Sequence, residues 1–126
     1  MKRANLVIGT RGSKLAMIYA ENVKKELKKY FSKEIELKKI ATTGDQKQDE
    51  RLSEIGGKGL FSKQIEKDLL NKNIDIAVHA LKDMPTVETQ NLLTNNFLKR
   101  NSPNEILISR ENIKFEDLKP NSVIGT

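Results

Sequence analysis

The sequence contains no cysteine and no tryptophan among its 126 residues, and it has a single histidine. Without cysteine the chain can form no disulfide, offers no thiolate ligand to a metal and has no cysteine nucleophile. A lone histidine argues against a histidine-based metal site, so we expect no metal. Aromatic residues make up only 5% of the chain. The core of the fold must therefore come from Ile, Leu and Val.

Long hydrophobic runs are also missing. No stretch of the sequence approaches the length of a membrane span. The N-terminus MKRANLVIGT has basic residues, but its apolar run is too short for a signal peptide. We therefore expect a cytoplasmic protein with no membrane partner, of a size that forms one ordinary domain.

The formal net charge of +6 is compatible with nucleic acid, an anionic membrane or an acidic small molecule as the partner. Lys24, Lys25, Lys28 and Lys29 carry much of this charge, on the outer side of an expected helix. A solvated helix face is the plainer interpretation of this cluster. No aromatic residues are interleaved with these lysines to stack on bases, so we expect no nucleic-acid partner.

Apolar patterns predict three strands, the first and third of them buried and the second partly alternating, which alternate with two amphipathic helices. The strands are expected over Asn5–Gly9, Glu34–Ala41 and Ile74–His79, and the helices after Ser13, which could be the N-cap, and over Leu60–Leu70. Strands that alternate with helices are typical of a parallel sheet with right-handed crossovers. The predicted fold class is α/β, with a parallel-rich sheet flanked by helices.

A turn-rich segment, Arg100–Glu105, indicates a linker between residues 1–100, a first lobe, and residues 101–126, the start of a second. Beyond it we expect a strand over Ile106–Ser109, a helical turn at FEDL and a strand at SVIGT. VIGT at 123–126 repeats VIGT at 7–10, as the opening of a second, similarly built lobe would. Too few residues follow the linker to close a core, so we expect a truncated chain whose last segment folds back or pairs with another copy.

Two motifs follow predicted strands, where open α/β sheets bind their ligands. In GTRGS, hydroxyl groups, free backbone N–H groups and the guanidinium of Arg11 suit a carboxylate or a phosphate. An N-cap with a surface arginine is the equally open alternative. In HALKDMP, Lys82 and Asp83 stand side by side before Pro85, either as a site or as a surface ion pair or turn cap. His79 is expected to pack or to bond the backbone rather than to bind a ligand.

Two further stretches are candidate binding loops. In GGKGLF, at residues 56–61, a flexible loop would bring Lys58 to an anion. The alternative interpretation is that these residues only form a tight entry into the following helix. It lacks the lysine–hydroxyl pair of a P-loop. The polar stretch from Thr43 to Gly57 has no periodicity and is long enough to act as a lid, or else to be disordered.

Taken together, GTRGS with SKLA, TTGD, IGGKGLFSKQIE and DIAVHALKDMP closely resemble porphobilinogen deaminases (hydroxymethylbilane synthases), in order and in spacing. The resemblance continues through NSPNEILIS and FEDLKPNSVIGT. It implies a transferase of haem and tetrapyrrole biosynthesis that joins four porphobilinogen molecules head to tail and releases ammonia. It also implies a covalently attached dipyrromethane cofactor and two lobes like those of periplasmic binding proteins, followed by a third domain with the cofactor cysteine.

The resemblance also implies roles for individual residues. Asp83 corresponds to the catalytic aspartate, and Ser13, Lys82 and Asp83 to cofactor contacts. Arg11 corresponds to a ligand of the substrate carboxylate, and Phe61 to an aromatic residue beside the substrate, which Lys58 would also approach. The Thr43–Gly57 stretch resembles a mobile active-site loop. The chain departs from the pattern at Glu54, where some members have Lys, and at Ala80, where many have Ser.

Carboxylate-bearing pyrroles suit these residues. Porphobilinogen carries an acetate and a propionate, which cationic side chains can neutralise. Loss of ammonia leaves positive charge on the pyrrole nitrogen, which a fixed carboxylate stabilises. The full-length family enzyme is expected to be a monomer, and the 126-residue form to be inactive. The rival interpretations are a two-lobed module that binds or senses small anions, because the architecture is similar, and a basic nucleic-acid binder.

Overall fold

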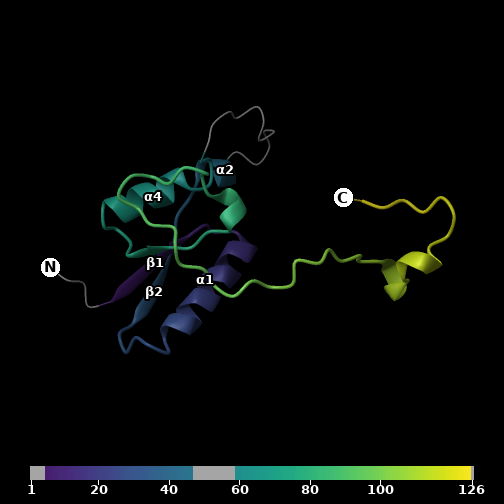
Figure 1. Ribbon diagram of the computed structural model, residues 1–126, viewed down its shortest axis with the longest axis horizontal. Helices are drawn as coiled ribbons and strands as arrows, with labels where there is room; N and C mark the ends of the chain where they lie inside the picture. The colour runs from purple at the N-terminus through teal and green to yellow at the C-terminus, as the bar shows by residue number, and fades with distance from the viewer. Residues whose placement is uncertain (1–4, 47–58, 126) are drawn as a thin grey trace. The chain divides into compact units, whose positions relative to one another are not determined.

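A computed structural model of the chain describes residues 5–46 and 59–125 (Figure 1). The chain divides into two compact units, residues 1–96 and residues 97–126. No helix in the described ranges is both long enough and apolar enough to cross a membrane.

The first unit is built on a sheet of three parallel strands in the order β2-β1-β3. The central strand β1 spans Leu6–Thr10, β2 spans Ile35–Lys39 and β3 spans Ile76–Ala77. β1 pairs along its whole length with β2, whereas β3 contributes only two residues to the ladder. Because the strands are parallel, their carboxyl ends lie at one edge of the sheet.

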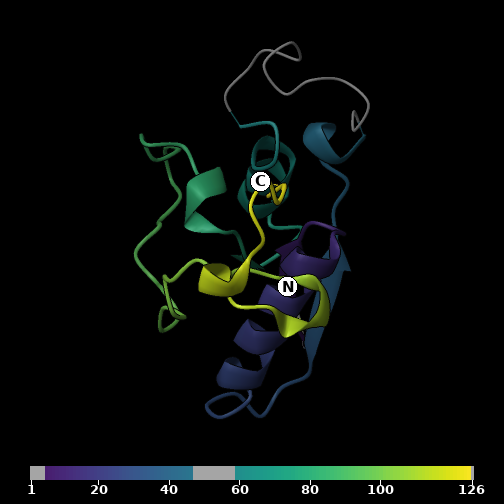
Figure 2. The same cartoon turned by 90° about the vertical axis from the view of Figure 1, so that its right-hand side faces the viewer.

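Helices cover both faces of this sheet (Figures 1 and 2). Helix α1 (Lys14–Leu27) packs on the face where Ile8 of β1 lies, and α4 (Lys63–Leu70) packs on the face of Val7. The α1 face buries Ile8, Ala20 and Ile35, and the α4 face buries Val7, Ile40, Ile65 and Ile74. Alternation along β1 thus divides the core into two aliphatic layers, as the scarcity of aromatic residues implied.

The predicted α/β class with a parallel sheet is confirmed, although the elements begin and end at different residues. Ser13 is the N-cap of α1, and its Oγ accepts a hydrogen bond from the Ala16 amide at 3.3 Å. The second helix begins at Lys63 rather than Leu60, since Gly59 has a φ of +80° and starts a turn that the helix then continues. The third strand is shorter than expected because the chain leaves the ladder after the Val78 amide donates to the Gly9 carbonyl at 3.0 Å.

The described part of the second unit contains two short 3₁₀ helices, η2 (Arg110–Asn112) and η3 (Phe115–Asp117). The latter confirms the helical turn expected at FEDL. The strands expected over Ile106–Ser109 and at SVIGT are wrong for the part the structure describes, which is extended or irregular there. An apolar run forms a strand only beside a hydrogen-bonding partner, and here Ile106 and Ile108 remain 80% and 85% exposed.

Candidate active site

The candidate site lies at the carboxyl-end edge of the sheet, where the segments that follow all three strands meet. Arg11 directly follows β1, Asp45 lies in the short helix α2 (Thr43–Gln46) after β2, and Asp83 lies in the 3₁₀ helix η1 (Leu81–Asp83) after β3. The strand order reverses beside β1, and such a reversal is where open α/β sheets form their ligand crevice. The topology therefore brings residues 72 positions apart to one place.

Arg11 is the centre of this cluster. Its Nε donates to both carboxylate oxygens of Asp45, at 3.1 and 3.2 Å, and its Nη2 donates to Asp45 Oδ1 at 2.6 Å. Its Nη1 donates to Asp83 Oδ2 at 3.3 Å. The bonds from Arg11 hold the pKa of the Asp45 carboxyl below its usual value, and the bond to Asp45 in turn raises the pKa of Arg11. Both groups are therefore charged at neutral pH.

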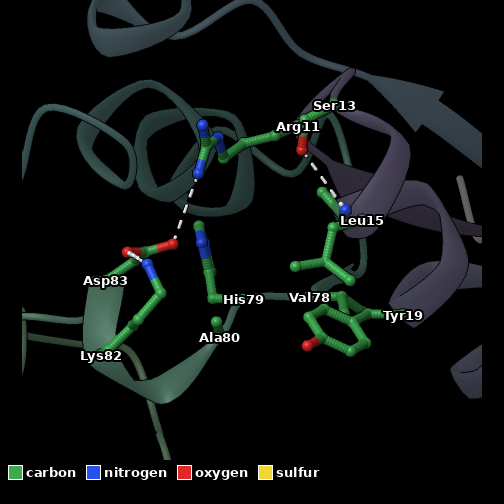
Figure 3. Close-up of a pocket in the computed structure, with 10 residues that line it drawn as sticks. Arg11, Ser13, Leu15, Tyr19, Val78, His79, Ala80, Lys82 and Asp83 are labelled. Atoms are coloured by element: carbon green, nitrogen blue, oxygen red, sulfur yellow. Dashed lines mark hydrogen bonds and ion pairs between the residues drawn. The ribbon is translucent and has the colours of Figure 1, made fainter. Parts of the chain in front are cut away.

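Asp83 is held by two cations at once. Its Oδ1 accepts from Lys82 Nζ at 2.7 Å, while Oδ2 faces Arg11. The Asp83 side chain is only 13% exposed, whereas that of Lys82 is 78% exposed. Figure 3 shows the two carboxylate oxygens turned toward these two partners. The site thus presents a sheltered carboxylate and an ammonium group that solvent reaches.

Phe61 contacts Arg11, and Gly44 in turn lies against Phe61. The guanidinium carbon of Arg11 lies 3.9 Å from the centroid of the Phe61 ring, the geometry of a cation–π contact. The opposite contact of the ring is with Gly44, where a Cβ atom would collide with ring carbons. The Gly44 amide donates to the Leu60 carbonyl at 3.0 Å, so that α2 and the turn before α4 are joined at this point.

A half-open pocket extends from this cluster toward the start of α1 (Figure 3). Its wall combines the polar groups of Arg11, Ser13, Lys82 and Asp83 with apolar side chains that include Leu15. Leu15 lies in the first turn of α1 and is 56% exposed. An exposed leucine beside three charged groups makes the pocket amphipathic.

His79 forms part of the pocket wall, but its ring nitrogens are buried. Neither nitrogen has a hydrogen-bond partner within the described residues, and neither has Oε1 of the buried Glu66. Burial lowers the pKa of His79 below its ordinary value, against the opposing charges of Glu66 and Asp83. The imidazole is therefore mainly neutral at pH 7. The backbone hydrogen bond allowed for in the sequence is not formed within the described residues, and the expectation that His79 binds no ligand stays a prediction.

Of the candidate residues from the sequence, the structure brings four into contact with one another: Arg11, Phe61, Lys82 and Asp83. Ser13 lines the same pocket, but its hydroxyl is engaged in capping α1. Lys58, Glu54 and all but Thr43–Gln46 of the proposed lid fall outside the described residues. Ala80 is in extended conformation at the start of η1.

Sequence reasoning missed the role of Asp45. The TTGD motif was recognised, but its aspartate received no function. The available signal was position, because TTGD follows β2, whose carboxyl end lies beside that of β1. Thr42 was also missed. It is 1% exposed and donates its hydroxyl to Asp45 Oδ2 at 2.6 Å.

The cluster can bind carboxylates and can stabilise a cation, but it has no metal-binding character. Within residues 5–46 and 59–125 no group of three or more His, Cys, Asp or Glu side chains is placed to hold a metal ion. Each site carboxylate is instead paired with a basic side chain.

Residues 6–126 match the family model described as "Porphobilinogen deaminase, dipyromethane cofactor binding domain". The chain is similar to porphobilinogen deaminases of Chlorobium chlorochromatii (46% identity over 125 residues) and Clostridioides difficile (48% over 124 residues). These alignments cover 98% and 97% of this chain, but only 40% and 41% of the two relatives. The chain thus spans about 40% of the length of the curated relatives it matches.

Proposed function

This chain belongs to the porphobilinogen deaminase family, and on that premise we propose that it forms one wall of a hydroxymethylbilane synthase active site. The proposed reaction joins four porphobilinogen molecules head to tail and releases one ammonia for each. The single observation that supports it best is the pairing of the sheltered Asp83 carboxylate with both Arg11 and Lys82.

In this proposal Asp83 performs the electrostatic part of the chemistry. When the aminomethyl C–N bond of porphobilinogen breaks, ammonia leaves and positive charge spreads to the pyrrole nitrogen. A carboxylate fixed close to that nitrogen stabilises the charge where it develops. Because Asp83 is 13% exposed, water screens it weakly and its effect is larger than that of a surface carboxylate. The same oxygens can accept a pyrrole N–H and move its proton.

Arg11 and Lys82 are proposed to bind the acetate and propionate groups of the pyrroles. Lys82 is largely exposed and can exchange Asp83 for a ligand carboxylate at little cost. Arg11 is more sheltered and more ordered, and a planar guanidinium suits a planar carboxylate. Phe61, stacked on Arg11, would border the ring of the substrate.

The residues present also fit a dipyrromethane. Such a group has carboxylates, which need cations, and pyrrole N–H groups, which need an acceptor. The pocket offers two cations and one carboxylate in contact with one another. We propose that Lys82 and Asp83 hold this group, with Ser13 close by at the start of α1. When bound, it supplies the primer to which new pyrrole rings are added.

We also infer that the first unit is one lobe of a two-lobed fold of the kind found in periplasmic binding proteins. The strand order β2-β1-β3 with a helix on each face supports this inference, since doubly wound lobes begin in this way. A lobe of this kind presents its carboxyl-end edge to the ligand, which is where Arg11 and Asp83 lie.

The test is substitution of Asp83 and Lys82 in the whole protein, assayed with porphobilinogen and by oxidation of the product to uroporphyrin. Asp83→Asn removes the charge while it keeps the size, and loss of one such group costs about 10²–10³ in turnover. Lys82→Gln should weaken binding or cofactor loading more than turnover. Asp68→Asn is the matched control, because Asp68 pairs with Lys38 at 3.3 Å, away from the cluster. Near wild-type turnover by cofactor-loaded Asp83→Asn would refute the proposal.

A further inference from the structure

Asp45 engages one edge of the Arg11 guanidinium almost completely. Nε and Nη2 lie on the same edge of that planar group, and both donate to the Asp45 carboxylate, with the shortest distance at 2.6 Å. Arg11 and Asp45 side chains are 19% and 22% exposed. A two-point pair that is sheltered in this way fixes orientation as well as distance.

The same contacts determine which part of Arg11 stays available. A guanidinium has five N–H donors. Asp45 takes the Nε–H and one N–H of Nη2, and Asp83 takes one N–H of Nη1. Within the described residues, one N–H on each of Nη1 and Nη2 has no acceptor. These two donors are the ones through which Arg11 can bind a further carboxylate.

Asp45 is itself firmly placed. Its Oδ2 accepts from the buried Thr42 hydroxyl at 2.6 Å, and its amide donates to the Thr42 carbonyl at 3.1 Å. The guanidinium carbon of Arg11 also lies over the Phe61 ring, 3.9 Å from its centroid. The long Arg11 side chain is thus ordered before any ligand arrives, and little rotamer freedom is left to lose on binding.

We propose that Asp45 is a positioning residue, which orders Arg11 so that its two remaining Nη donors bind a ligand carboxylate. The ligand class, a pyrrole carboxylic acid, rests on the proposed function, whereas the ordering of Arg11 by Asp45 does not. The opposing charge keeps Asp45 ionised at neutral pH, because it lowers the pKa of this carboxyl.

The test uses the chain itself, labelled with ¹⁵N. The Nε–H signal of Arg11, assigned by its disappearance in Arg11→Lys, should exchange slowly with water in the wild type and fast in Asp45→Asn. Titration with porphobilinogen, and separately with glutarate as a plain dicarboxylate, then gives dissociation constants from the shifts of backbone amide signals. Asp45→Asn should weaken both by about tenfold, the range for one hydrogen bond to a charged group. Asp45→Glu, which restores the charge, should stay within about threefold of the wild type.

Asp68→Asn is the control for loss of a carboxylate elsewhere in the unit. It should change neither the exchange rate of the Arg11 Nε–H nor the dissociation constants. Backbone amide spectra show whether each variant is folded. If Asp45→Asn is not, Thr42→Val replaces it, because it removes the hydroxyl that holds Asp45; it should weaken binding of both ligands, whereas Asp45→Glu should not. Slow exchange of the Arg11 signal in Asp45→Asn, or unchanged affinity for both ligands, would overturn the proposal. Binding of glutarate with the predicted loss, but no binding of porphobilinogen, would support the positioning role and count against the proposed function instead.

Discussion

Replacing Gly44 with alanine should disturb the fold and the site together. Gly44 is buried in α2 against the Phe61 ring. An added Cβ would meet Phe61 Cε1, and would lie 2.5 Å from Cζ and 2.7 Å from Cδ1. The ring has little room to retreat, because its face lies 3.9 Å from the Arg11 guanidinium carbon. Either α2 or the ring must shift.

The expected cost follows from two opposing terms. Overpacking of this kind costs about 1–3 kcal/mol. Alanine is favoured over glycine inside a helix by about 0.5–1 kcal/mol, which offsets part of that cost. The net loss of unfolding free energy should be about 1–2 kcal/mol, which lowers the melting temperature of a domain of this size by about 5–15 °C. If the ring moves, the cation–π contact with Arg11 is weakened as well.

Thermal and urea unfolding followed by circular dichroism measure this loss. Gly12→Ala is the matched control, since a Cβ at Gly12 has no atom within 4 Å, and it should change the midpoint little. The Arg11 Nε–H signal reports whether the ring has moved. A Gly44→Ala variant that unfolds at or above the wild-type midpoint would show that contact with Phe61 does not constrain this position.

Two further predictions concern the core and the pH dependence. Gly9→Ala should cost about 1–3 kcal/mol in urea unfolding, because its Cβ would meet Ile74 Cδ1 and lie 2.9 Å from Ile40 Cδ1; stability equal to that of Gly12→Ala would contradict this. The second prediction concerns pH. Arg11 lowers the folded-state pKa of Asp45 below 3.8. The contribution of the Arg11–Asp45 pair to the free energy of unfolding is therefore complete above that pH and is lost as the pH falls through the folded-state pKa. The gap in unfolding free energy between wild type and Asp45→Asn should therefore be full at pH 7 and shrink below pH 3.8, and a constant gap would refute the assignment.

The parallel sheet could be predicted from sequence because its signals are local and repeated. Apolar runs such as that of β1, the capping serine Ser13 and the amphipathic face of α4 each depend on neighbouring residues. The wrongly predicted strands of the second unit depended on contacts that are not local. The runs at Ile106 and Val123 look like strands, but a strand also needs a partner, and partners are a property of the tertiary structure.

Sequence motifs identified residues of the candidate site but not the contacts between them. The pairing of Lys82 with Asp83 could be suspected from adjacency alone. The bond from Arg11 to Asp83 crosses 72 positions and depends on the order of the strands. The contact of Phe61 with Arg11 depends in addition on the small Gly44, which leaves room for the ring. Such contacts are set by where chain segments meet, and no single window of sequence contains them.

The brevity of β3 gives the two halves of the cluster unequal stiffness. Arg11 continues the central strand, which is hydrogen-bonded on both sides, and α1 begins three residues later at Lys14. Asp83 lies in a single 3₁₀ turn that follows a strand with only two residues in the ladder. On the proposed function, we expect a bound ligand to displace the Asp83 side of the cluster more readily than Arg11.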